Sequence, residues 1–369
     1  MEIAELGEFG LIRHLTENIE IKNRETVKGV GDDCAVMDYG GERVVLMTTD
    51  LLLEGVHFDL QYVPLKHLGY KAAMVNLSDI YAMNGRPRQM TVSLGVSKRF
   101  SVENLEEIYA GLRLACDSCQ CDIVGGDTSA SMTGLTISIT VIGDAARDKV
   151  VYRSGAKEND IICVTGDLGA AYMGLQLLER EKGIYYEQSR ELQQKIAEAK
   201  ESGDSQKLST LNAQLSTIAT PDFTGREYLL ERQLKPEARK DIIEALAAAG
   251  IVPTAMMDIS DGLSSELMHI CKQSNVGCRV YEERIPLDYQ TAAAAEEMNL
   301  NVTTCAMNGG EDYELLFTVP LSQNDAIQAV PGVKTIGYIT RAEAGQWLVC
   351  RDGTEMELKA QGWNPLKNS

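Results

Sequence analysis

Short apolar runs alternate along the chain with longer segments in which apolar residues return every three or four positions. The short runs are typical of buried strands, and the longer segments have the spacing of helices that bury one face. Strands are predicted at 44–47, 90–96, 122–124, 135–142, 160–165, 315–319 and 347–350. Helices are predicted at 7–18, 66–83, 101–118, 170–180, 237–249 and 263–273.

The helix predicted at 66–83 is apolar nearly all round, and we therefore expect it to be buried. Asn76 and Asp79 are three residues apart on this helix and share one face. A carboxylate there needs a partner, because an unpaired buried charge is costly. The partner is either a metal ion or an ordinary neighbour, such as a lysine or a backbone amide, and the sequence leaves both open.

Residues 181–222 differ from the rest of the chain because they are rich in Gln, Glu, Lys and Ser. Apolar residues keep roughly helical spacing on either side of Ser202-Gly203-Asp204, at Leu192, Ile196, Leu208, Leu211, Leu215 and Ile218. We expect a helical hairpin on the surface, with a disordered loop as the alternative.

The length of 369 residues is more than one compact core normally accommodates, so we expect two domains. The segment from Gly143 to Lys149 has the character of a linker. It places the domains at 1–149 and 150–369, with the segment 181–222 inserted in the second.

Acidic residues outnumber basic ones by 54 to 35, and the formal net charge is −19. Such a surface repels nucleic-acid backbones, so we expect no nucleic-acid partner. A polyphosphate ligand would need multivalent cations to approach it. The first residues lack a basic start and an apolar run, and no apolar run is long enough to cross a bilayer. We expect a cytoplasmic protein with no membrane partner.

The nine cysteines are scattered, and most lie in apolar runs, as reduced core residues of a cytosolic protein would. Cys116, Cys119 and Cys121 are close together, but no second Cys or His pair at zinc-finger spacing accompanies them. The pattern therefore favours core residues over a zinc site.

Four segments place acids beside glycine or hydroxyl residues, at 31–33, 48–50, 125–128 and 258–262. We expect 48–50 at the carboxyl end of its strand and 125–128 in a tight turn that follows another strand. Any one of these aspartates alone is typical of a turn or a strand cap. Together they indicate a site for several hard cations that holds phosphates, because oxygen ligands suit Mg²⁺.

The chain lacks the common nucleotide-binding motifs. It contains no Gly-Lys dipeptide, which a Walker A loop requires, and Gly29-Val30-Gly31 lacks the third glycine of a dinucleotide fingerprint. A nucleotide would therefore bind in another kind of fold.

Seven motifs occur in the order seen in the thiamine-monophosphate kinases, a family of the aminoimidazole-ribonucleotide-synthetase-like superfamily of ATP-using enzymes. They are Gly31-Asp32-Asp33-Cys34-Ala35, Thr48-Thr49-Asp50, Asn76-Leu77-Ser78-Asp79, Gly125-Gly126-Asp127, Arg153-Ser154-Gly155-Ala156, Asp258-Ile259-Ser260-Asp261-Gly262 and Gly309-Gly310-Glu311-Asp312-Tyr313-Glu314-Leu315. The chain resembles this family over nearly its whole length. It departs from the family at 181–222, which is longer than the usual connection, and matches loosely at the carboxyl-terminal tail.

The resemblance implies an α/β fold of two domains. In such a fold the sheet of the amino-terminal domain pairs with that of a second copy in a homodimer, and the carboxyl-terminal α/β domain is larger. ATP would lie in the cleft between the two domains.

The resemblance also implies roles for individual residues. Mg²⁺ ions would be bound by Asp33, Thr48, Thr49, Asp50, Asp79, Asp127, Asp258 and Asp261. ATP would contact Tyr109, Gly126, Arg153 and Ser260, and thiamine monophosphate would contact His57, Glu311 and Trp363. The ordinary alternatives are a plain loop residue for His57 and a core residue for Tyr109.

The implied activity is ATP-dependent phosphorylation of thiamine monophosphate to thiamine diphosphate, the last step in the synthesis of that cofactor. The acceptor is a phosphate with a second pKa near ~6, so it is already an anion at neutral pH and direct in-line transfer needs no general base. Selenophosphate synthetases and a hydrogenase-maturation protein of the same superfamily fit less well, because we see no cysteine before Cys34 and none at the carboxyl end. A nucleotide-binding or metal-binding module without catalysis is the non-enzyme alternative.

Overall fold

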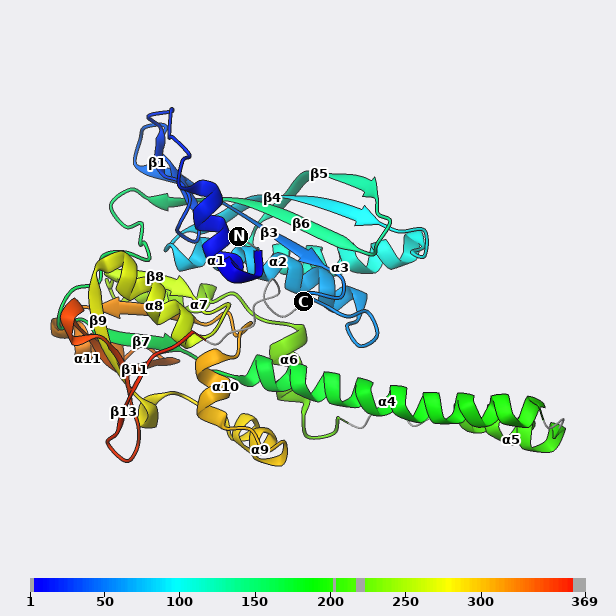
Figure 1. The fold of residues 1–369 in the computed structure, drawn as a ribbon. Coiled ribbons are helices and arrows are strands. Elements are labelled where there is room, and N and C mark those ends of the chain that lie inside the picture. The colour runs from blue at the N-terminus through cyan, green and yellow to red at the C-terminus, as the bar shows by residue number, and fades with distance from the viewer. Residues whose placement is uncertain (1–2, 202–203, 217–222, 361–369) are drawn as a thin grey trace.

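The computed structural model describes residues 3–201, 204–216 and 223–360, and within them thirteen strands form two sheets (Figure 1). One sheet has six strands in the order β1-β2-β3-β6-β4-β5. The other has seven, in the order β13-β12-β9-β11-β7-β10-β8. The mixture of sheets and covering helices confirms the predicted α/β class.

The six-stranded sheet uses the amino-terminal part of the chain. Its strands are β1 (Thr26–Lys28), β2 (Ala35–Met37), β3 (Arg43–Leu53), β4 (Arg86–Val96), β5 (Asp122–Ala130) and β6 (Thr136–Ala146). Helix α1 (Ile3–Thr16) precedes it, and helices α2 (Leu65–Ala82) and α3 (Val102–Cys119) lie along one face of the sheet (Figure 1). Helix α2 is buried on nearly every residue, as its composition predicts.

The seven-stranded sheet uses the rest of the chain. Its strands are β7 (Ile161–Thr165), β8 (Ala255–Asp258), β9 (Val276–Tyr281), β10 (Leu315–Val319), β11 (Val333–Arg341), β12 (Gln346–Val349) and β13 (Glu355–Glu357). The helices around it are α6 (Glu227–Leu234), α7 (Lys240–Ala248), α8 (Leu263–Ser274), α9 (Tyr289–Glu297), α10 (Val302–Asn308) and α11 (Asn324–Gln328). Single 3₁₀ turns occur at Glu282–Arg284, Leu321–Gln323 and Ala342–Ala344.

The largest cluster of buried apolar side chains joins the two sheets. It contains Leu46 of β3 and Ile80 of α2, together with Met256 of β8 and Phe317 of β10. Because α2 packs against β8 in this shared core, the polar face of α2 meets the carboxyl end of β8. This contact positions the site described below.

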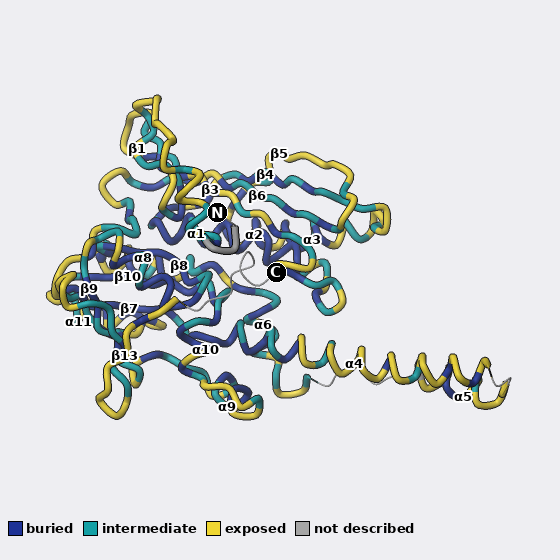
Figure 2. The backbone as a smooth tube through the Cα atoms, in the orientation of Figure 1, coloured by how far each residue is buried: buried dark blue, intermediate teal, exposed yellow. Residues whose placement is uncertain are grey.

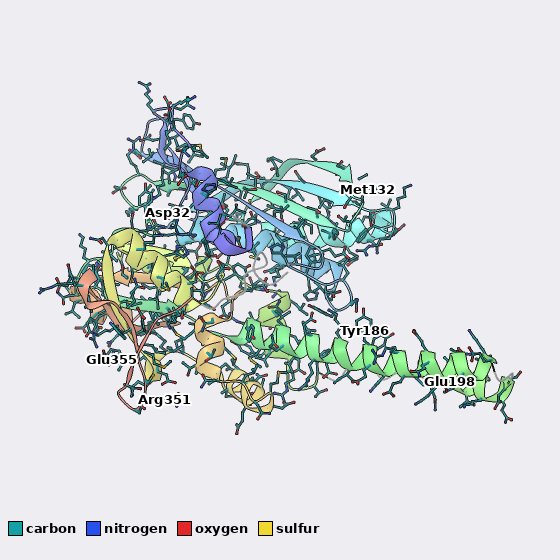
Figure 3. All side chains as sticks on the ribbon, viewed as in Figure 1. Asp32, Met132, Tyr186, Glu198, Arg351 and Glu355 are labelled. Atoms are coloured by element: carbon teal, nitrogen blue, oxygen red, sulfur yellow. The ribbon has the colours of Figure 1, made fainter. Side chains whose placement is uncertain are left out.

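Two helices form an arm that extends away from both sheets (Figure 1). Helix α4 runs from Ala170 to Glu201 and helix α5 from Ser205 to Ser216, so the prediction that the first helix ends at 180 is wrong. A small apolar contact of Ile196, Ala199 and Leu211 holds the two helices together. Most other residues of the arm are exposed, and Figure 3 shows the side chains of Tyr186 and Glu198 on it. Figure 2 shows the exposed surface that continues along α4.

Three local predictions are wrong because strands continue further than their composition indicates. Residues 48–50 lie in the middle of β3, which pairs with β6 without interruption from Arg43 to Leu53. Residues 125–128 lie inside β5 instead of in a turn. Residues 143–146, taken as the start of a linker, pair with β3 as the end of β6.

Within the described residues, no helix is both long and apolar enough to span a membrane.

Candidate active site

Three aspartates from distant parts of the sequence, two buried and one half-buried, meet where the two sheets share their core. Asp33 follows β1 in a turn, Asp79 lies on α2, and Asp258 ends β8. One carboxylate oxygen from each lies within 4.8 Å of the other two. We call Asp33, Asp79 and Asp258 the acid cluster. The sequence analysis selected all three, although 225 residues separate the first from the last.

Strand β3 contributes the next polar groups because its residues alternate between the core and the other face of the sheet. Val44, Leu46 and Leu52 are buried, and Thr48 and Asp50 share their side of the strand. The Thr48 hydroxyl donates a hydrogen bond to Asp79. Thr48 and Asp50 therefore reach the acid cluster from the sheet.

Helix α2 fixes the positions of several of these groups. The Asn76 side-chain oxygen accepts a hydrogen bond from the Asp50 backbone amide at 3.0 Å. The Ser78 hydroxyl donates to Asp258 at 2.5 Å and so links the two halves of the molecule. As predicted, Asn76 and Asp79 act from one face of the helix, and the direct partner of Asp79 is a hydroxyl.

Burial and mutual repulsion make the acids of this region weaker than usual. Loss of water raises the pKa of Asp33 to about 7, against the opposing effect of Arg153. Burial raises the pKa values of Asp50, Asp258 and Asp261 to about 6 each. The pKa of Asp79 also rises well above its usual value, because of burial and the charges of Asp50 and Asp258. Carboxylates crowded in this way favour binding of a proton or a cation.

The acid cluster has oxygen atoms left for a cation. The Asp33 Oδ2 atom is buried and has no hydrogen-bond partner. Several carboxylate oxygens gathered at one point form a donor set that suits Mg²⁺. The residues present therefore fit a hard divalent cation.

Arg153 is the cation closest to this cluster. Its Nε donates to Asp33 Oδ1 at 3.0 Å, and its Nη2 donates to the same oxygen at 2.5 Å. Its backbone amide donates to Asp32 at 3.0 Å. Figure 3 labels Asp32 where the two halves of the molecule meet. One guanidinium does not balance the cluster, because two further carboxylates face it.

A cavity of about 140 Å³ opens beside the acid cluster. Its lining includes six of the predicted site residues: Asp50, His57, Asp79, Asp258, Ser260 and Glu311. Glu311 comes from the segment between α10 and β10, and its backbone has a φ of 66°, a left-handed conformation that is uncommon outside glycine. The cavity therefore brings the predicted metal and substrate residues together.

His57 faces this cavity as a neutral ring at physiological pH. Its Nδ1 accepts a hydrogen bond from the Leu53 backbone amide at 3.0 Å. Burial lowers the pKa of His57, although the nearby carboxylates of Glu311 and Glu8 oppose that change. The ring is thus suited to contact a neutral or cationic ligand group.

Other predicted residues lie outside the acid cluster and the cavity lining. Thr49 is exposed on the opposite face of β3 from Thr48, and its hydroxyl donates to the Ile139 carbonyl. Asp127 is exposed on β5, the edge strand of its sheet. Tyr109 on α3 packs against the apolar core. Trp363 lies outside the described residues.

Close contacts with neighbouring segments fix two further predicted residues, Gly126 and Asp261. Gly126 approaches β4 so closely that a Cβ atom there would lie 1.7 Å from the Val92 carbonyl oxygen. Asp261 lies next to the cluster, and its backbone amide donates to Glu266 at 2.9 Å.

The sequence analysis missed Lys71 and Glu266, which are both buried. Lys71 lines the cavity, and Glu266 holds the turn that carries Asp261. The signal that could have found Lys71 was its position in the largely apolar helix α2, because a buried charged residue needs a specific partner. Ser78 was part of a quoted motif, but its bond to Asp258 is visible only in three dimensions.

Known proteins match this chain over nearly its whole length and over nearly the whole of their own. The family described as AIR synthase related protein, N-terminal domain, matches residues 31–145. A thiamine-monophosphate kinase of Aquifex aeolicus is 34% identical over 98% of this chain and 99% of its own length. That of Bacillus subtilis is 30% identical over 98% of this chain and 100% of its own. A solved structure described as AaThiL complexed with AMPPCP and TMP has a TM-score of 0.77 and 30% identity, over 99% of both chains.

Proposed function

The chain belongs to the thiamine-monophosphate kinase family, and from this membership we propose that it phosphorylates thiamine monophosphate with ATP to give thiamine diphosphate. The product forms by direct transfer of the γ-phosphoryl group. The related structure holds a nucleotide analogue and thiamine monophosphate together, which supports ATP as the co-substrate. The enzyme is thus a phosphotransferase whose acceptor is a phosphate.

The observation that carries the proposal is the acid cluster at the edge of a cavity lined by His57 and Glu311. Two substrates that both carry phosphate must meet beside buried carboxylates, which would repel them. Mg²⁺ held by Asp33, Asp79 and Asp258, with Asp50 adjacent, would neutralise this charge and that of the phosphates. Thr48, Asp261, Thr49 and Asp127 complete the proposed metal-binding set by family resemblance.

The remaining residues position the two substrates. Arg153 and Ser260 lie at the cluster and would contact ATP, with Gly126 and Tyr109 assigned to ATP by family resemblance. His57 and Glu311 would contact the organic part of thiamine monophosphate, and Trp363 is assigned to it in the same way. None of them has to remove a proton, because the acceptor phosphate is already ionised at neutral pH.

We propose that the enzyme works as a homodimer. The face of the six-stranded sheet opposite α2 exposes large apolar side chains, among them Met47 and Leu51 of β3 and Ile142 of β6. Met47 and Ile142 are paired in register, so they form one patch. An exposed apolar patch of this kind is suited to a second copy of the chain. Sedimentation equilibrium would test this: a monomer at micromolar concentration contradicts it.

We also propose a cytoplasmic location, for which the state of the cysteines gives support. All nine are free, and eight of them are buried. Free thiols are typical of a reducing compartment.

A coupled assay of ADP release tests the proposed reaction, with thiamine monophosphate, thiamine and water compared as acceptors, with and without Mg²⁺. We expect release only when thiamine monophosphate and Mg²⁺ are both present. ATP binding that depends on Mg²⁺ but gives no ADP with any acceptor would contradict the proposal and favour a binding module.

A further inference from the structure

Lys71 is a buried cation at the cavity that none of the assigned roles includes. It lies on α2 and is 5% exposed. Its ammonium group is 3.0 Å from Glu311 Oε1 and donates to the Gln233 carbonyl oxygen, also at 3.0 Å. Among the described residues that line the cavity, Lys71 is the only lysine or arginine. It therefore pairs with a residue assigned to the substrate.

Gln233 completes the arrangement from helix α6. This side chain is 5% exposed, and its Nε2 donates to Glu311 Oε2 at 2.8 Å. Both oxygens of the Glu311 carboxylate are thus held, one by Lys71 of α2 and one by Gln233 of α6. The three residues come from three separate elements and link the two halves of the molecule.

The backbone around Glu311 is unusual. Glu311 and Tyr313 have φ angles of 66° and 51°, a left-handed conformation that is unfavourable for residues with side chains. Such conformations persist when surrounding contacts fix them, and they occur often at ligand sites. The bonds from Lys71 and Gln233 supply contacts of this kind.

The geometry of α2 separates Lys71 from the phosphate end of the site. Lys71, Val75 and Asp79 follow at intervals of four residues and all line the cavity. Eight residues of helix span ~12 Å along its axis, so the backbone positions of Lys71 and Asp79 are about that far apart along α2. The ammonium group of Lys71 bonds to Glu311 and to the Gln233 carbonyl oxygen.

We propose that Lys71 and Gln233 are positioning residues that hold the Glu311 carboxylate for the organic part of the acceptor substrate. This inference rests on the proposed function. Lys71 already balances the charge of Glu311. The Glu311 carboxylate therefore recognises the substrate by accepting a hydrogen bond from its aminopyrimidine amino group. It does not serve as the counter-ion of the thiazolium ring.

Steady-state kinetics of Lys71→Met tests the proposal, with Lys66→Met as the control because Lys66 is an exposed lysine on the same helix. We expect Lys71→Met to raise the KM for thiamine monophosphate by roughly 10- to 100-fold, the effect of losing a charge-assisted hydrogen bond. The KM for ATP should stay near its normal value, and Lys71→Arg should restore part of the loss. An unchanged KM for thiamine monophosphate, or a loss confined to kcat, overturns the proposal.

A double-mutant cycle separates positioning from direct contact. If Lys71 acts through Glu311, Lys71→Met adds little to the defect of Glu311→Gln. If the two effects multiply, Lys71 contacts the substrate itself and the positioning role is wrong. Gln233→Met removes the hydrogen bond to the other carboxylate oxygen of Glu311 and gives the same test. The proposal therefore stays testable if one variant fails to fold.

A substrate analogue tests the recognised group. The thiamine monophosphate analogue with hydrogen in place of the pyrimidine amino group lacks the proposed donor and should react poorly with the wild-type protein. Lys71→Met should lose most of this discrimination, and discrimination of wild-type size in the variant overturns the assignment. Absence of turnover by the wild-type protein with thiamine monophosphate itself would overturn the proposed function and this inference together.

Discussion

Two groups of acids in the interior of the molecule differ in their partners. The acid cluster of Asp33, Asp79 and Asp258 gathers carboxylates around one point, and Arg153 pairs with one of them, Asp33. The second group, which we call the paired acids, consists of Asp312 and Glu314, beside β10. Both groups have nearly fully buried members, with Asp312 at 2% exposed and Asp258 at 3%. Burial alone therefore does not distinguish them.

The paired acids have partners for all their oxygens. Asp312 accepts hydrogen bonds from the backbone amides of Gly169 and Ala171 at the start of α4. Glu314 pairs with Arg232 at 2.7 Å, and also with Arg239 and the Thr165 hydroxyl. Each carboxylate oxygen of this group has a partner within the protein, so removing one of these partners would be strongly destabilising.

What distinguishes the acid cluster is that positive groups of the protein do not balance all of its negative charges. Acids whose partners are arginines and helix amides have no need of a ligand. Among the described residues of the acid cluster, Asp33 alone pairs with an arginine. Burial and the neighbouring carboxylates raise the pKa values of the cluster, so a bound cation would favour its ionised form. Burial also raises the pKa of Asp312 to about 7, against the opposing charge of Arg232, so a raised pKa does not by itself distinguish the two groups.

The largest effect should come from Asp258→Asn. Loss of one carboxylate from the acid cluster should reduce turnover by about 10³-fold or more, because metal-held phosphate charge is worth several kcal/mol in the transition state. Stability without Mg²⁺ should be unchanged or higher, since one repelling charge is gone. ADP release and thermal unfolding measure the two effects. Asp117→Asn, an exposed acid of α3, is the control, and near-normal turnover of Asp258→Asn would refute the role of the cluster.

The paired acids should respond in the opposite way. Arg232→Met leaves Glu314 and Asp312 without their shared cation, and breaking a buried ion pair costs about 3–5 kcal/mol. Urea unfolding should show this loss. Mg²⁺ should not restore the lost stability, and a variant as stable as the wild type would show that the two groups do not differ as described.

The pH dependence of stability tests the charge state of the acid cluster. Folded-state pKa values near 6 to 7 for Asp33, Asp50 and Asp258 exceed the ordinary value of ~3.9, so the folded state retains protons that the unfolded state releases. Without Mg²⁺, stability contributed by these groups is present below about pH 4 and lost as the pH rises through about 7.

Mg²⁺ must displace the same protons, so its stabilising effect should grow over this pH range. The rise in Tm on adding Mg²⁺, measured at about pH 5 and at about pH 8, tests this. An increase that is equal at both pH values, or larger at the lower one, would contradict the described charge state of the cluster.

The smallest effect should come from His57→Ala. The variant should raise the KM for thiamine monophosphate by about 10-fold and change kcat by less than ~3-fold, because in its proposed role His57 contacts the substrate and not the transferred group. In His57→Asn the side-chain oxygen can still accept a hydrogen bond from the Leu53 backbone amide. Comparing the two variants therefore separates loss of this hydrogen bond from loss of the imidazole ring. A pure kcat defect would argue against the substrate role.

The sequence predicted much of the fold because periodicity and composition agree in the buried elements. Helix α2 and strand β10 lie within one residue of their predicted bounds. The errors occurred where a strand carries polar or glycine residues, as at Thr48–Asp50 and at Gly125–Thr128, because such residues usually end strands. The polar composition beyond residue 180 similarly concealed the continuation of α4 to Glu201.

The acids of the site were also predictable, whereas their partners were not. Asp33, Asp79 and Asp258 stand in recognisable motifs, but which face of a strand turns inward depends on register. Register therefore decides that Thr48 and not Thr49 meets Asp79. The contact of Lys71 with Glu311 joins residues 240 positions apart, and no local pattern indicates it.

Cation binding by the acid cluster is tested most directly by counting bound Mn²⁺ as a substitute for Mg²⁺. Electron paramagnetic resonance would follow the titration in the presence of a non-hydrolysable ATP analogue, for the wild-type protein, Asp79→Asn and the control Asp117→Asn. The account predicts that Asp79→Asn binds fewer ions per chain, or binds them much more weakly, while the control matches the wild type. Equal number and affinity in all three proteins would show that the acid cluster is not the metal site.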